Sequence, residues 1–252
     1  MKTTNYTFLI ACAALSVSAM LCGCSSKNII SGDGTVETRD TCIEAFESLT
    51  VTSGIDVTFT ATEAGAKASA HISAPKSLMP YLVMEVKDGK LTVGLDNSHN
   101  YRSTDRINIS ISAPMASTFA ATSGADLEIA CAYPADTITL QCTSGADIVV
   151  PAITCSAITA QCTSGADIEI KKLSADTATL QCTSGADIDV ECTSVFSLDA
   201  SATSGAGIDI SGKVEALICS ATSGAVIDAS KIDKSTLLKH EISKNSAASV
   251  RF

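Results

Sequence analysis

The sequence predicts an all-β protein built around a parallel β-helix, a β-solenoid with about 20 residues per coil, preceded by a β-rich N-terminal region. A phrase containing Ser-Gly-Ala occurs six times, with its glycines at positions 124, 145, 165, 185, 205 and 224. Apolar and polar residues alternate on both sides of each copy, which is the period of a β-strand. No segment shows a helical period, and 20 residues are too few for a propeller blade, which needs about 40.

The first 23 residues predict a lipoprotein signal peptide. The apolar stretch from Phe8 to Met20 is shorter than the roughly 20 residues that span a bilayer. This stretch is followed by Leu21-Cys22-Gly23-Cys24, which resembles a bacterial lipoprotein cleavage site with Cys24 as the acylated residue. The alternative is an ordinary secretory signal with incidental cysteines. Residues 24–42 are interpreted as a tether, because they begin with a small, polar stretch.

Residues 43–115 are predicted to be a β-rich region that caps or extends the solenoid. Ser53-Gly54 gives a forerunner of the repeated phrase, and Asp88-Gly89 between two alternating segments predicts a hairpin with a tight turn. A further strand from Ile107 to Ser112 is stopped by Pro114. Residues 116–230 hold the β-helix repeats, and residues 231–252 are expected to form a C-terminal cap, since a bare end of a β-sheet is prone to pairing.

Within the repeats, equivalent residues should stack on successive coils about 4.8 Å apart. Large and small apolar residues fall into separate columns, as a narrow interior requires. The four inward columns predicted are Phe119, Leu140, Ala160, Leu180, Ala200, Cys219; Ala121, Cys142, Cys162, Cys182, Ala202, Ala221; Leu127, Ile148, Ile168, Ile188, Ile208, Ile227; and Ile129, Val150, Ile170, Val190, Ile210. Outward-facing Gln141, Gln161 and Gln181 are expected to form an amide ladder.

Two outward columns of the repeats are acidic, and the only candidate metal site lies among their carboxylates. Asp147, Asp167 and Asp187 would stack directly, and oxygen ligands suit calcium. The competing interpretation is that each aspartate accepts hydrogen bonds from amides at the bend and is otherwise solvated. We favour that interpretation and predict no metal, because calcium-binding β-helices have a nine-residue period with additional glycines.

The stacked Cys142, Cys162 and Cys182 are interpreted as buried free thiols. Alanine replaces cysteine at both ends of the column, which indicates a need for a small apolar side chain. Disulfides remain the alternative, although in-register parallel pairs rarely have the required torsion. The spacing of 20 residues is unlike that of zinc ligands.

Composition excludes several classes of function. The net charge of −10 argues against a nucleic-acid partner, and an aromatic content of 4% argues against a stacking platform for bases or sugars. His71, His99 and His240 are scattered, and neither a nucleophile elbow nor a phosphate-binding loop is present. We therefore predict no catalytic residues, no cofactor and no enzymatic activity.

The order of the motifs resembles one bacterial family. The phrase Gly54-Ile55-Asp56-Val57, the hairpin from Val86 to Val93, the strand ending at Pro114 and the repeated Ser-Gly-Ala phrase are similar to the layout of the head GIN domain family, over roughly residues 43–252. Its members are often lipoproteins and are described as auto-transporter adhesins. The resemblance implies an all-β, β-helix-like fold, but the Gly-rich C-terminal phrase usual in the family is not apparent in residues 244–252.

Three classes of function remain open. The expected one is a lipid-anchored, adhesin-like binding module of the bacterial cell envelope, attached to the outer membrane on its periplasmic or surface side, with a protein or polysaccharide as ligand. The second is a structural envelope protein without a ligand. The third is a β-helix polysaccharide lyase or hydrolase, which is disfavoured because basic and aromatic residues are sparse among the repeats. The binding residues and the oligomeric state are not indicated.

Overall fold

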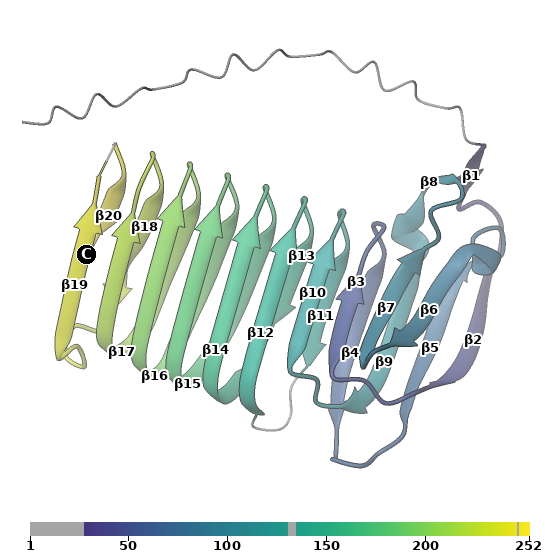
Figure 1. Ribbon diagram of the computed structural model, residues 1–252, viewed down its shortest axis with the longest axis horizontal. Helices are drawn as coiled ribbons and strands as arrows, with labels where there is room; N and C mark the ends of the chain where they lie inside the picture. Colours follow the sequence, from purple (N-terminus) through teal and green to yellow (C-terminus); the bar gives the residue numbers. More distant parts are fainter. Residues whose placement is uncertain (1–27, 131–134, 246) are drawn as a thin grey trace, which may run out of the picture.

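The computed structural model describes residues 28–130, 135–245 and 247–252 (Figure 1). It confirms the predicted fold class: the described chain is all-β, with stacked parallel coils about 20 residues apart and only two single-turn 3-10 helices. These short helices are η1 (Met79–Tyr81) and η2 (Thr104–Arg106). A small separate sheet pairs β1 (Ile29–Ser31) with β8 (Asn100–Arg102).

Each rung of the solenoid consists of two strands, which are joined by a Ser-Gly turn in every rung from β3–β4 to β17–β18. Equivalent residues face one another in parallel register, as in the pairing of Gln141 with Gln161 and of Gln161 with Gln181. In spatial order, the rungs are formed by β7 (Lys90–Leu95) and β9 (Asn108–Pro114), β3 (Ser48–Val51) and β4 (Asp56–Thr62), β10 (Thr118–Thr122) and β11 (Asp126–Ala130), β12 (Ala135–Thr143) and β13 (Asp147–Val150), β14 (Ile153–Thr163) and the start of β15 (Asp167–Thr183), β15 and the start of β16 (Asp187–Thr203), β16 and the start of β17 (Gly207–Ala221), β17 and β18 (Val226–Ile232), and β19 (Lys239–Lys244) and β20 (Ser249–Arg251).

The repeated Ser-Gly pair forms the turn by placing two consecutive residues in the left-handed region. Ser164 has a φ of 61° and Gly165 a φ of 66°, and the equivalent pairs in the other copies have similar values. Glycine adopts this conformation without steric cost, which explains its recurrence. The turns also bond to one another along the stack, since the Gly185 N–H donates to the Ser204 carbonyl at 3.2 Å.

All four predicted inward columns are buried, so these predictions are confirmed. Alternation explains the result, because in each strand every second side chain points inward between the two faces of the rung. The core continues without a break into the N-terminal region, where the rings of Phe59 and Phe119 meet edge-on with their centroids 4.9 Å apart. No polar or charged residue of the described chain is buried in this core.

The N-terminal end of the solenoid is covered by antiparallel strands. β2 (Val36–Ile43) pairs with β5 (Ala68–Pro75), which pairs with β9, while β6 (Leu82–Lys87) pairs with β7. The predicted hairpin at Asp88-Gly89 is confirmed, with φ values of 51° and 74° that match the favoured tight turn. Figure 1 shows these strands gathered at one end, whereas β19 and β20 form the other.

Candidate binding face

One outer face of the solenoid carries a regular array of uncharged polar side chains. It is formed by the strands that precede the turns, whose outward residues read Thr-Gln-Thr on three successive rungs. We call it the threonine–glutamine face; its members are Thr139, Gln141, Thr143, Thr159, Gln161, Thr163, Thr179, Gln181 and Thr183. In a chain with a net charge of −10, this face contains no charged residue.

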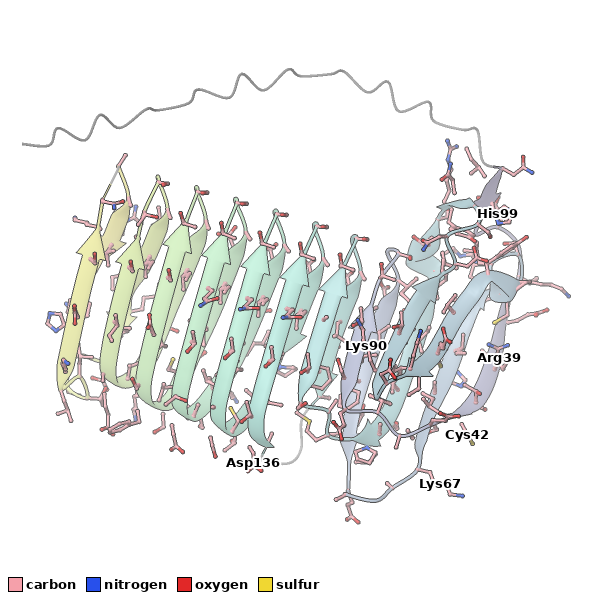
Figure 2. The ribbon with its side chains drawn as sticks, in the orientation of Figure 1. Arg39, Cys42, Lys67, Lys90, His99 and Asp136 are labelled. Carbon is pink, nitrogen blue, oxygen red and sulfur yellow. The ribbon has the colours of Figure 1, made fainter. Side chains whose placement is uncertain are left out.

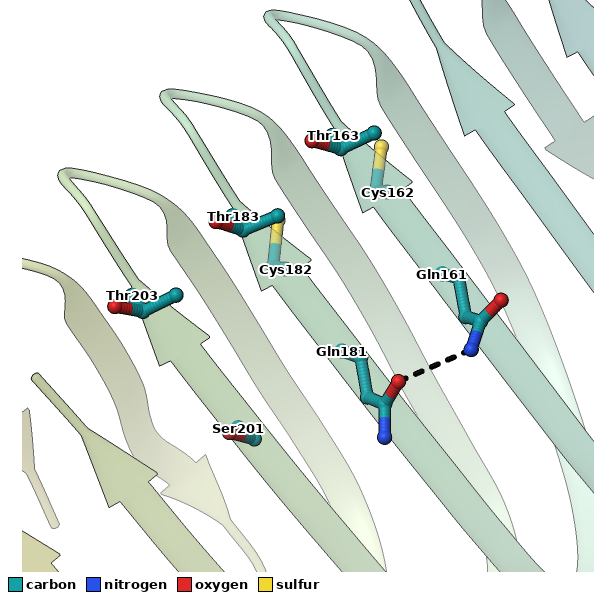
Figure 3. A pocket seen from close by; sticks show the side chains of 8 residues that line it. All are labelled: Gln161, Cys162, Thr163, Gln181, Cys182, Thr183, Ser201 and Thr203. Carbon is teal, nitrogen blue, oxygen red and sulfur yellow. Dashed lines mark hydrogen bonds between the residues drawn. The ribbon is translucent and has the colours of Figure 1, made fainter. Parts of the chain in front are cut away.

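The glutamines form the predicted amide ladder, which is confirmed. Gln141 Nε2 donates to Gln161 Oε1 at 3.2 Å. Gln161 Nε2 donates to Gln181 Oε1 at 3.1 Å, the bond drawn in Figure 3. The ladder stops at Gln181 because the next rung has Ser201, whose side chain is too short to continue it. Gln181 Nε2 therefore has no acceptor within the part of the chain that the structure describes.

A shallow groove runs between the glutamine column and the threonine column. Its volume is about 420 Å³, and Figure 3 shows the amides on one side and the threonine side chains on the other; it is lined by Gln161, Cys162, Thr163, Gln181, Cys182, Thr183, Ser201 and Thr203. On each rung, the threonine hydroxyl lies close to that of the adjacent serine, with 3.5 Å between Thr163 Oγ1 and Ser164 Oγ. The groove thus offers threonine hydroxyls and glutamine amides at the spacing of the rungs.

The strands that follow the turns carry the acidic columns. Asp126, Asp147, Asp167 and Asp187 are in register on successive rungs and are exposed. Partial desolvation is the main cause that raises the pKa of Asp126, Asp147 and Asp167. The second cause is the negative charge of the aspartate on the preceding rung, which is Asp56, Asp126 and Asp147 respectively. The column ends at Gly207, where a Cβ atom would lie 2.2 Å from Asp187 Oδ1. The two faces of the solenoid therefore differ in charge, one neutral and one acidic.

The structure places the calcium candidates Asp147, Asp167 and Asp187 side by side, as the repeat requires. Among residues 28–130, 135–245 and 247–252, however, no three His, Cys, Asp or Glu side chains converge in a way that could hold a metal ion. A column of carboxylates on one flat strand surface supplies oxygens from one side only, whereas calcium needs six to eight ligands around it.

The described cysteines are all unpaired. Cys42 is exposed, while Cys142, Cys155, Cys162, Cys182, Cys192 and Cys219 are buried. In the stacked column each thiol donates to a main-chain carbonyl, as Cys162 Sγ does to Ala166 O at 2.9 Å. Hydrogen bonding with Cys142 and then burial raise the pKa of Cys162 strongly, and burial raises that of Cys192 to about 12. Such thiols stay protonated and are poor nucleophiles.

The three histidines lie in separate places. His71 Nδ1 is 2.7 Å from Asp40 Oδ1 on the surface, and His240 stacks on Phe252 at the C-terminal end. His99 lies at the end of the N-terminal region opposite Cys42 (Figure 2).

His99 belongs to a cluster that the sequence analysis missed. The rings of His99, Tyr81 and Tyr101 contact one another in a cluster. Ser98 Oγ lies 2.5 Å from Asp96 Oδ1 and 2.6 Å from His99 Nδ1. Serine stands between acid and imidazole here, so the histidine does not link the acid to a nucleophile as in a catalytic triad. The hydrogen bond from Ser98 lowers the pKa of Asp96 to about 2. The nearby His99 and Tyr101 in one polar loop were the only local signal, because Tyr81 belongs to η1.

The predicted lipidation site, Cys24, lies outside the described residues. Across residues 28–130, 135–245 and 247–252, no helix has the length and apolar character needed to span a bilayer.

Fold and surface together define a class of protein: a β-solenoid with one covered end and a repetitive neutral face. The family model described as "Putative auto-transporter adhesin, head GIN domain" matches residues 45–171 and 159–252. The chain therefore belongs to the head GIN domain family, as its motifs suggested.

Solved structures share this fold. A "putative adhesin" from Bacteroides fragilis has a TM-score of 0.73 at 16% identity, covering 88% of this chain and 99% of that one. A "putative adhesin" from Parabacteroides merdae has a TM-score of 0.63 at 14% identity, covering 88% and 98% of the two chains. A "putative lipid binding protein" from Parabacteroides distasonis has a TM-score of 0.63 at 16% identity, covering 89% and 99%. No curated protein sequence matches the chain.

Proposed function

We propose that this protein is a non-catalytic, lipid-anchored binding module of the cell envelope, and that its threonine–glutamine face binds a neutral polysaccharide. The observation that carries the proposal is the uncharged ladder of amides and hydroxyls beside a groove of about 420 Å³. The adhesin description of the family supports a binding role.

The chemistry of the face favours a hydroxyl-rich ligand. Amide and hydroxyl groups both donate and accept hydrogen bonds, as sugar hydroxyls do, and no charge on the face repels or selects an ion. Rungs recur about every 4.8 Å, so an extended polymer meets the same groups repeatedly and gains avidity from many weak contacts. Gln181 Nε2, at the end of the ladder, supplies a free donor beside the groove.

The test is binding of the purified protein to an array of neutral and charged glycans, followed by calorimetry with the best ligand. Replacing Gln161 and Gln181 together by Ala should weaken binding at least tenfold, because each lost pair of hydrogen bonds costs roughly 1 kcal/mol. Glu128→Ala with Glu169→Ala, on the acidic face, is the matched control and should leave the affinity unchanged.

Three results would contradict the proposal. Binding that fails only in the acidic-face control would move the site to the other face. Release of unsaturated or shortened products would establish a lyase or hydrolase. Absence of binding to every neutral glycan would favour a structural envelope protein without a ligand.

Anchoring is tested separately. Cys24→Ser should abolish incorporation of radiolabelled fatty acid in cells and move the protein from the membrane fraction to the soluble fraction. Cys22→Ser, two residues earlier, is the control that should retain both properties. Labelling of the Cys24→Ser variant would exclude this residue as the lipidation site.

A further inference from the structure

The two ends of the solenoid are unlike. Antiparallel strands cover the N-terminal end, and the outermost of them, β2 and β6, pair only with β5 and β7 in the described chain. At the other end no antiparallel layer of the described chain covers the last rung, where β19 pairs with β17 and β20 with β18. All six residues of β19 are exposed. Leu238, just before this strand, is 81% exposed, and Ile242 within it is 38% exposed. An open strand edge with exposed apolar residues is a template for pairing with another chain.

The backbone of β19 shows which residues are free to pair. Lys244 lies opposite Ala221, and the Asn245 N–H donates to the Ala221 carbonyl at 3.2 Å. In a parallel ladder successive residues direct their N–H and C=O groups to opposite sides. Odd-numbered residues of β19 therefore bond to β17. His240, Ile242 and Lys244 direct theirs to the open edge.

We infer that β19 is a self-association interface, at which two copies of this chain join end to end by antiparallel pairing of β19 with β19 around a two-fold axis at His240. The partner is a second copy because the strand is complementary to itself. With His240 opposite His240, Lys239 lies opposite Glu241 of the second copy. The Leu238 N–H already donates to the Glu215 carbonyl at 2.8 Å, so Leu238 joins through its side chain alone, opposite Ile242. By symmetry each of these pairs occurs twice.

The neighbouring registers lack this complementarity. Moving the axis to Lys239 places Lys239 opposite Lys239, and moving it to Glu241 places Glu241 opposite Glu241. Moving it to Ile242 leaves Lys239 and Glu241 without an opposite charge. Only the His240 axis joins both opposite charges and both exposed apolar residues. Cross-strand pairs of this kind each contribute about 0.2–1 kcal/mol, and like charges directly opposite are destabilising.

Aromatic and charged side chains pack together on the end face beside β19. The His240 and Phe252 rings stack with their centroids 4.7 Å apart, and Lys234 Nζ lies 4.9 Å above the Phe252 ring. Because a two-fold pairing uses the same edge, β19, in both copies, it closes as a dimer and does not propagate into a fibre.

Sedimentation velocity of the full chain in density-matched detergent tests the interface by charge reversal. Lys239→Glu or Glu241→Lys alone turns two attractive pairs into two repulsive ones and should weaken dimerisation about tenfold or more. The double variant restores two opposite-charge pairs and should dimerise like the unchanged chain. Since both residues are exposed, the melting temperature measured at a dilution where every variant is monomeric is expected to stay the same.

Cross-linking gives a second measurement. In a Cys42→Ser background, His240→Cys places two cysteines directly opposite each other across the axis and should form a disulfide-linked dimer on mild oxidation. Ser243→Cys, which lies on the same strand away from the axis, is the control and should not. A monomer at every concentration, larger assemblies, or a dimer that is insensitive to the charge reversals would overturn the inference. Each readout is independent of glycan binding.

Discussion

The rings of Phe59 and Phe119 meet edge-on, with 4.9 Å between their centroids and an interplanar angle of 67°. Phe59 lies in β4 and Phe119 in β10, so the contact joins the N-terminal region to the first of the six repeats. Both side chains are fully buried. The covered end and the repeats therefore share one core, and this has a measurable consequence.

Replacing Phe119 by Ala should lower the free energy of unfolding by about 3–5 kcal/mol, because a large buried ring leaves a cavity. Urea denaturation followed by circular dichroism should still show one transition, since the core is continuous. Phe119→Leu, which keeps most of the volume, is expected to cost less. Two separate transitions in the unchanged protein would contradict a shared core.

Two glycines should respond very differently to alanine. Gly165 has a φ of 66° and no atom within 4 Å of its would-be Cβ, so Gly165→Ala adds only the left-handed strain of about 1–2 kcal/mol. At Gly212, whose φ is 87°, a Cβ would lie 2.1 Å from the Cys192 carbonyl oxygen. Gly212→Ala must therefore also shift the backbone.

We expect Gly212→Ala to destabilise the protein clearly more than Gly165→Ala in the same denaturation experiment. Ser164→Gly, at a φ of 61°, is the complementary control and should be neutral or slightly stabilising, because it removes left-handed strain from a residue with a Cβ. Equal losses at Gly165 and Gly212 would mean that the close approach to Cys192 is not tight.

Thiol labelling should separate the exposed cysteine from the buried ones. Native protein treated with Ellman's reagent at pH 8 should show a fast reaction that falls by one thiol in Cys42→Ser, since Cys42 is the exposed one among the described cysteines. The buried thiols should react only on denaturation, because burial raises the pKa of Cys155 and Cys219 to about 11. Rapid native modification of Cys162, located by mass spectrometry, would contradict the stacked column.

The acidic column predicts a pH-dependent effect on stability. The folded-state pKa of Asp167 is raised by desolvation and then by Asp147, so folding favours the protonated carboxyl group. That contribution is complete below the ordinary value of 3.8 and is lost as the pH rises through the raised folded-state pKa. Asp167→Asn, which carries no charge, should therefore raise the melting temperature at pH 7.

At pH 3 this gain should disappear, because the unchanged carboxyl is then protonated as well. Asp233→Asn is the matched control, for which we expect a change in stability of the opposite sign. The hydrogen bond from Ser235 lowers the pKa of Asp233, so the charged form stabilises the fold and its removal should cost stability at pH 7. An Asp167→Asn gain that persists unchanged at pH 3 would rule out the ionised carboxylate of Asp167 as its cause.

Periodicity made the solenoid predictable, because one coil's pattern recurs and each column can be checked against the others. Gln161 was identified as part of a ladder because its equivalents stand 20 residues away on both sides. The groove beside it was not, since it depends on how far the amides and threonines project from the strand. The cluster of Tyr81 with His99 was also missed, because it brings η1 against a loop that no local pattern connects to it.

The open edge of β19 could not be predicted from the sequence for a similar reason. Residues 231–252 were expected to be a cap, and the alternation in β19 resembles any other strand. Only the one-sided pairing with β17 shows that its outer edge is unpaired within the described chain.

The order of the rungs has a consequence for how the chain assembles. β3 and β4 precede β7 and β9 in the sequence, yet they lie in space between these strands and β10 with β11. The first rung to be synthesised is thus an interior one, with two bare edges until later segments arrive on both sides. Growth cannot simply proceed coil by coil from the N-terminus. The β3–β4 rung instead forms first and is completed on both edges only later. Its edges stay unpaired while residues 63–118 are being synthesised, and mispairing is most favoured during that interval.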